Sequence, residues 1–122
     1  MIRALLCIAL ALHWCAAPAA GDDKKPTRGQ FYGAIAYHAD SKSAGWATDR
    51  RTAREAKVEA LRQCGHERCE VVASITRGCG AVARGRGAKL IVERGATGNE
   101  AQTKALRVCG AGCEVVAWTC TR

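Results

Sequence analysis

Two hydrophobic periods alternate along the first half of the chain. Short runs of apolar and β-branched residues predict strands, whereas apolar residues spaced three and four apart predict a helix. The expected elements are strands over 31–38, 46–48 and 69–75 and a helix over 53–64. Thr52 and Glu55 have the spacing of a capping box at the start of this helix, and Gly65 is suited to end it.

The same order of elements returns in the second half because the sequence repeats. Residues 52–65 and 97–110 agree at eight positions, among them Thr, Glu, Leu, Cys and Gly. Two flanking blocks agree in the same order: Gly33–Ala36 with Gly80–Ala83, and Cys69–Ala73 with Cys113–Ala117. This pattern indicates a duplication. Further strands are therefore expected over 80–84, 88–93 and 113–120, and a second helix from its Thr97 cap to about Cys109.

A half of this size is too small to bury a core alone, so the two halves should merge into one α+β domain over residues 31–122. The repeats span about 31–76 and 79–120, each a β-β-α-β unit. We expect one mixed sheet, or two abutting sheets, with two helices and pseudo-two-fold symmetry. The expected core residues are Ile35, Val58, Leu61, Val71, Val72, Val82, Leu90, Val92, Leu106, Val115, Val116 and Trp118.

The first nineteen residues have the pattern of a secretory signal peptide. Arg3 precedes an apolar run over residues 4–12, and small residues precede a cleavage point after Ala19. The run is too short to span a membrane, so no transmembrane segment is expected. Residues 20–30 are polar and predict a flexible leader. The protein is therefore expected to be exported, to the periplasm or beyond.

Eight cysteines in 122 residues are unusual. Six remain after the signal peptide, and an even number in an exported chain favours three disulfides. Repeat symmetry pairs Cys64 with Cys69 and Cys109 with Cys113, which leaves Cys79 to pair with Cys120. A zinc site is the alternative, but export and the number of cysteines disfavour it. No metal or cofactor is expected.

The net charge of +8 draws attention to two basic clusters. Arg84, Arg86 and Lys89 surround a glycine-rich turn, and Arg50 and Arg51 lie just before the first helix, where the helix dipole disfavours cations. These residues are either solvated surface charges or a site for an anionic partner. An anionic envelope polymer or an acidic protein fits an exported chain, whereas nucleic acid does not.

No catalytic constellation stands out. His38, Asp40, Ser41 and Ser43 are close in sequence, but they belong to one polar turn without an exposed nucleophile elbow. Glu55 and Glu100 are accounted for as helix caps. The chain is therefore not expected to be an enzyme.

Several motifs together resemble a known bacterial family. They are Gly33–Tyr37, Gly45-Trp46, Ala60-Leu61 with Cys64-Gly65, Cys69 with Val71-Val72, and Cys79–Ala81. In order and spacing they are similar to the domain of unknown function 4189, over about residues 31–120. The resemblance implies a small, exported, disulfide-bonded protein built from a duplicated α/β unit, and it implies no established reaction. Some members are thought to act as secreted effectors. Residues 89–92 depart from the family pattern, because they hold no aromatic counterpart of Trp46.

The sequence thus favours an exported, non-enzymatic binding module. A periplasmic inhibitor or immunity-type protein and a secreted effector are the alternatives. A hydrolase of envelope polymers is the least favoured hypothesis.

Overall fold

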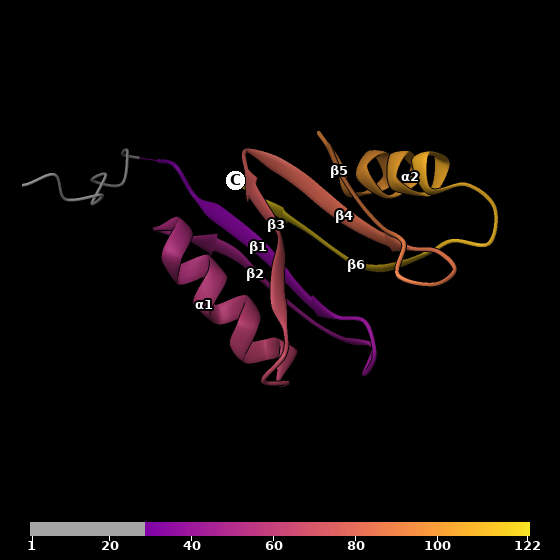
Figure 1. The fold of residues 1–122 in the computed structure, drawn as a ribbon. Helices are drawn as coiled ribbons and strands as arrows, with labels where there is room; N and C mark the ends of the chain where they lie inside the picture. The colour runs from indigo at the N-terminus through magenta and orange to yellow at the C-terminus, as the bar shows by residue number, and fades with distance from the viewer. Residues whose placement is uncertain (1–28) are drawn as a thin grey trace, which may run out of the picture.

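The computed structural model describes residues 29–122, which form two three-stranded sheets, each covered by one helix (Figure 1). The first half contains β1 (Tyr32–His38), β2 (Ser43–Arg50), α1 (Ala53–Cys64) and β3 (Glu70–Thr76). The second contains β4 (Gly78–Arg84), β5 (Leu90–Gly95), α2 (Gly98–Cys109) and β6 (Glu114–Thr121). The predicted duplicated α+β fold is confirmed. The expected signal peptide, and the leader except for its last two residues, lie outside the described part of the chain.

The strand order is β2-β1-β3 in one sheet and β5-β4-β6 in the other. Of the two expected arrangements, the structure therefore has two abutting sheets, and all strand pairs are antiparallel instead of mixed. The reason is topological. The connection through α1 carries the chain across β1, so β2 and β3 run in the same direction but have β1 between them. The second half repeats this path around β4.

Successive side chains of the central strands β1 and β4 point to opposite faces of their sheets, and the molecule therefore has four layers. Ala34 and Ala36 of β1 contact α1, whereas Ile35 points to the opposite sheet, as the period of two requires. In β4, Ala81 and Ala83 contact α2, and Val82 meets Ile35 in the core between the sheets. The order α1, first sheet, second sheet, α2 can be followed in Figure 1.

Both helices lie very close to their sheets. The buried residues of α1 are Ala56, Ala60 and Cys64, and those of α2 are Ala101, Ala105 and Cys109. On the sheet side, Gly45 lies directly under α1, and a Cβ there would collide with the backbone of Ala60 and Cys64. Gly95 occupies the matching place under α2, where a Cβ would lie 2.7 Å from the nitrogen of Ala101.

This close approach corrects part of the expected core. Ile35 and Val82 are fully buried, as predicted. Val58, Leu61, Leu106 and Trp118 are exposed instead. Because small side chains form the helix–sheet contact, the larger apolar residues of the two helices lie outside it. Trp118 is on β6, which is an edge strand of its sheet. The other six expected core residues are half-buried.

The helices begin where the sequence predicts. The side-chain oxygen of Thr52 accepts a hydrogen bond from the backbone nitrogen of Glu55 at 3.0 Å, and Thr97 accepts one from Glu100 at 3.1 Å. Gly65 ends α1 with a φ of 70°, a left-handed conformation that glycine adopts without strain.

Three disulfides have the pairing that repeat symmetry predicts. Cys64–Cys69 closes the turn from α1 to β3, and Cys109–Cys113 closes the turn from α2 to β6. Cys79 and Cys120 are direct cross-strand partners in β4 and β6, and their disulfide closes a much longer stretch of chain. It fixes the final strand to the centre of its sheet.

Replacing Cys79 and Cys120 together by alanine should lower the free energy of unfolding by about 4 kcal/mol, because the bridge closes a loop of 41 residues. The matched change at Cys109 and Cys113, whose loop is 4 residues, should lower it by about 2 kcal/mol. Urea denaturation under non-reducing conditions measures both. Equal losses would contradict a role of loop length.

Candidate functional site

The glycine-rich turn between β4 and β5 presents two of the predicted cations. The backbone nitrogen of Gly85 donates to the oxygen of Lys89 at 3.0 Å, and Gly87 has a φ of 67°, so the turn is tight and requires glycine. Arg86 is exposed at its tip. Arg84, at the end of β4, is half-buried and lies on the side that faces the other sheet.

Lys89 has a different environment. Its ammonium group donates to the carbonyl oxygen of Cys109 at 2.6 Å. That oxygen belongs to the last residue of α2, where a cation is favoured by the helix dipole. Lys89 therefore has an intramolecular partner, and we leave it out of the candidate site.

A third cation joins Arg84 and Arg86 from the other half of the chain. Lys42, in the turn between β1 and β2, lines with them a shallow hollow of about 510 Å³. Glu114 is the one acidic residue in its lining. Within residues 29–122 none of the three cations forms an ion pair. We call this place, lined by Lys42, Arg84, Arg86 and Glu114, the basic hollow. Sequence reasoning missed Lys42, because only the fold brings the two turns together.

The predicted cations before α1 are arranged differently. Arg50 lies 3.6 Å from a carboxylate oxygen of Glu59, whereas Arg51 is exposed. Glu59 also accepts hydrogen bonds from Arg62 at 2.9 Å and from Gln63 at 3.1 Å. The hydrogen bonds from Arg62 and then from Gln63 lower the pKa of Glu59 from 4.5 to about 2. The nearby carboxylate of Glu59 thus offsets the unfavourable interaction of the Arg50 cation with the helix dipole.

The polar turn after β1 does bring together the residue types of a catalytic triad. Nδ1 of His38 is 2.7 Å from the hydroxyl of Ser41, which donates onward to Ser43 at 2.9 Å. However, Nε2 of His38 is 4.0 Å from Asp40, whose side chain is 91% exposed. A solvated carboxylate beyond hydrogen-bond distance does not orient an imidazole for catalysis.

His66 adds a second imidazole to this turn. Its ring stacks on that of His38, with a centroid distance of 4.2 Å and an interplanar angle of 10°. The two histidines lack further ligands for a metal ion, since no cluster of three or more His, Cys, Asp and Glu of that kind occurs among the described residues. The same part of the chain holds no helix long and apolar enough to cross a membrane.

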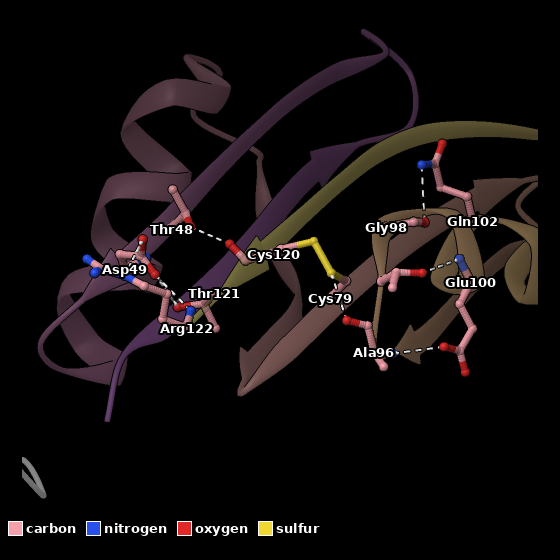
Figure 2. The surroundings of a disulfide bond; sticks show 11 residues. Thr48, Asp49, Cys79, Ala96, Gly98, Glu100, Gln102, Cys120, Thr121 and Arg122 are labelled. Atoms are coloured by element: carbon pink, nitrogen blue, oxygen red, sulfur yellow. Dashed lines mark hydrogen bonds and ion pairs between the residues drawn. A yellow bond between two sulfur atoms is a disulfide. The ribbon is translucent and has the colours of Figure 1, made fainter. Parts of the chain in front are cut away.

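The edge strands β2 and β6, from opposite halves, lie side by side and run in the same direction (Figure 2). The hydroxyl of Thr48 donates to the carbonyl oxygen of Cys120, and the backbone nitrogen of Asp49 donates to the hydroxyl of Thr121 at 3.2 Å. Both pairs are separated by 72 residues in sequence. We call the contact between residues 42–50 and 114–122 the β2–β6 seam.

Asp49 closes one end of the seam. Its carboxylate accepts the backbone nitrogen of Arg122 at 2.8 Å and the guanidinium of the same residue at 3.2 Å. The hydrogen bond from the backbone of Arg122 is the main reason that the pKa of Asp49 is lowered. This carboxylate therefore stays charged and holds the strands in register.

Two tryptophans face a groove along the seam. Trp46 and Trp118 are also 72 positions apart, two residues before Thr48 and Cys120. Their side chains are 46% and 47% exposed. With Gln102 and residues 115–120 they line a groove of about 510 Å³, which we call the aromatic groove. None of its lining residues is charged.

Sequence reasoning missed this groove for two reasons. Trp118 was expected in the core, and Trp46 was expected to lack a counterpart because none occurs at the repeat-related position. The structure supplies the second aromatic from β6 instead of β5. No local signal could reveal it, since the pairing depends on how the two halves dock.

Comparison with known proteins places these features in context. The family model "domain of unknown function (DUF4189)" matches residues 32–120. The chain is similar to Rv1813c from Mycobacterium tuberculosis, whose structure was solved by NMR. The two share 31% sequence identity, the match covers 98% of each chain, and the TM-score is 0.55. No curated protein matches the chain significantly.

The low pKa of Glu59 predicts a loss of stability in acid. A carboxylate whose pKa is lower in the folded state stabilises the fold above pH 4.5, and this contribution is lost as the pH falls toward about 2. The free energy of unfolding should therefore fall more steeply over this range in the wild type than in Glu59→Gln. Denaturation at a series of pH values measures the slope.

Two arginine variants provide the matched control. Arg62→Met should reduce the slope more than Arg50→Met, because hydrogen bonding from Arg62 is the largest cause of the shift and the charge of Arg50 the smallest. Identical slopes in the wild type and in Glu59→Gln would contradict this account.

Proposed function

The chain belongs to the family of domain of unknown function 4189, and on that premise we propose that it is an exported binding module whose basic hollow holds an anionic polymer. The observation that carries the proposal is the grouping of Lys42, Arg84 and Arg86 around one hollow without ion pairs in the described part of the chain. Export is supported by the six described cysteines, all of which are in disulfides.

Like charges held together repel one another, and a bound anion relieves that repulsion. Lys42 and Arg86 come from two turns at the same end of the molecule, while Arg84 is partly shielded from solvent. The planar guanidinium of an arginine matches the geometry of a carboxylate or phosphate group, and it binds either with two hydrogen bonds. Glu114 offsets only one of the three positive charges.

The shape of the hollow favours a polymer over a small anion. It is shallow and lined by glycine backbone at Gly85, Gly87 and Gly112, which leaves the cations accessible along an open surface. A single small anion in such a place remains largely hydrated. A polymer presents several charges to the same surface, so its weak contacts reinforce one another.

Replacing both Arg84 and Arg86 by alanine should weaken binding of poly-L-glutamate about fivefold to thirtyfold, which corresponds to roughly 0.5–1 kcal/mol for each partly exposed charge. Titration calorimetry at low salt measures the affinity. The melting temperature should change little, because these side chains contribute little to folding. Wild-type binding should also weaken as salt rises and the Debye length shortens.

The matched control is the double variant Arg54→Ala/Arg107→Ala, which removes the same charge from exposed positions on α1 and α2. It should bind poly-L-glutamate almost as the wild type does. If both double variants lose the same affinity, net charge accounts for binding and the basic hollow does not. A wild type that binds no polyanion at low salt overturns the proposed function itself.

A further inference from the structure

The basic hollow and the aromatic groove are adjacent along the β2–β6 seam, because Glu114 lines the hollow and Val115, the next residue of β6, lines the groove. Lys42 and Glu114, which both line the hollow, are 72 positions apart, as are Trp46 and Trp118 in the groove. The hydrogen-bonded pairs at Thr48 and Asp49 have the same separation. Lys42 directly precedes β2, and the four residue steps from Lys42 to Trp46 span at most about 13 Å along the seam.

The groove suits a ligand with flat apolar faces and polar edges. Two half-exposed indoles offer aromatic faces, which pack against the C–H faces of sugar rings, and each indole also carries an N–H donor. The side-chain nitrogen of Gln102 donates to the oxygen of Gly98 at 3.2 Å. This bond orients the amide and leaves its oxygen without a partner among residues 29–122.

We propose that the β2–β6 seam binds an acidic polysaccharide, with sugar rings against Trp46 and Trp118 and acidic groups toward Lys42, Arg84 and Arg86. The inference rests on the proposed function, because the basic hollow supplies the charged half of the site. The groove supplies the other half. A polyanion without sugar rings can use only the hollow, and a neutral sugar can use only the groove, so each binds more weakly than a chain that carries both.

The site is held in shape before any ligand binds. Trp118 packs on Gly98, where a side chain would collide with the indole ring. The bonds of Asp49 with Thr121 and Arg122 fix the far end of the seam, and the Cys79–Cys120 disulfide anchors β6 to its sheet (Figure 2). A rigid site loses less conformational entropy when it binds a ligand.

The test compares two probes with ten carboxylates each: decagalacturonate, which has sugar rings, and deca-L-glutamate, which has none. The wild type should bind decagalacturonate more tightly. Trp46→Ala should weaken binding of decagalacturonate about tenfold and leave binding of deca-L-glutamate within about twofold. Tryptophan fluorescence should shift with decagalacturonate and not with deca-L-glutamate.

Two controls keep the result interpretable. Val58→Ala truncates another exposed apolar residue, on α1, and should leave both affinities unchanged. Trp118→Phe keeps an aromatic ring over Gly98 and should weaken decagalacturonate binding less than Trp46→Ala does. Melting temperatures show whether each variant is folded.

The outcomes separate the two proposals. If the wild type binds both probes equally and Trp46→Ala binds them as the wild type does, the polysaccharide inference is wrong and the basic hollow remains a general anion site. If neither probe binds at low salt, the proposed function fails and the inference fails with it. Loss of both affinities in a folded Trp46→Ala would also overturn the inference, because the groove would not then discriminate sugar rings.

Discussion

Each three-stranded sheet has two faces to bury but only one helix, and this constraint joins the two halves of the molecule. Alanine residues on β1 and β4 are buried by α1 and α2. The opposite faces carry Ile35 and Val82, which have no helix of their own and are buried only where the sheets meet. The folded state of either half therefore depends on the other, which is why a unit of this size occurs twice.

The junction between the halves also creates the surface that carries the proposals. Edge strands must pair or be covered, and here side chains at the edges bond to backbone groups of the opposite half. Thr48 of β2 donates to the carbonyl of Cys120, and Arg94 of β5 donates to the carbonyl of Ser74 at 3.2 Å. The bond between β5 and β3 occupies the guanidinium of Arg94. Beside the bond between β2 and β6, Trp46 and Trp118 remain exposed. The two sides of the junction thus differ although the repeats match, and only one of them offers a groove lined by aromatic rings.

How much the sequence could predict depends on whether a feature is local. The strands, the caps at Thr52 and Thr97 and the two short disulfides follow from short spacings that occur twice, so each half supports the interpretation of the other. The pairing of Cys79 with Cys120 follows by elimination. The wrong core assignments at Val58 and Leu106, which lie on the two helices, have another origin. Hydrophobicity indicates that a residue can be buried, but the alanine contact decides which side of a helix lies close to its sheet. The place of Lys42 in the basic hollow, and that of Trp46 beside Trp118, depend on docking between residues 72 positions apart, which no local pattern encodes.

The position of β6 in the chain has a consequence for the order in which the protein folds. β6 is the last of the eight elements, yet it provides Glu114, Trp118 and Cys120 and the partners of Thr48 and Asp49. A chain that is synthesised with its first half leading therefore cannot complete the seam until β6 has followed. Until then, β2 is an unprotected edge, and Cys79 is a free thiol open to non-native pairing. Formation of the Cys79–Cys120 disulfide thus has to wait for the end of the chain, and the first half must stay soluble until the final strand arrives.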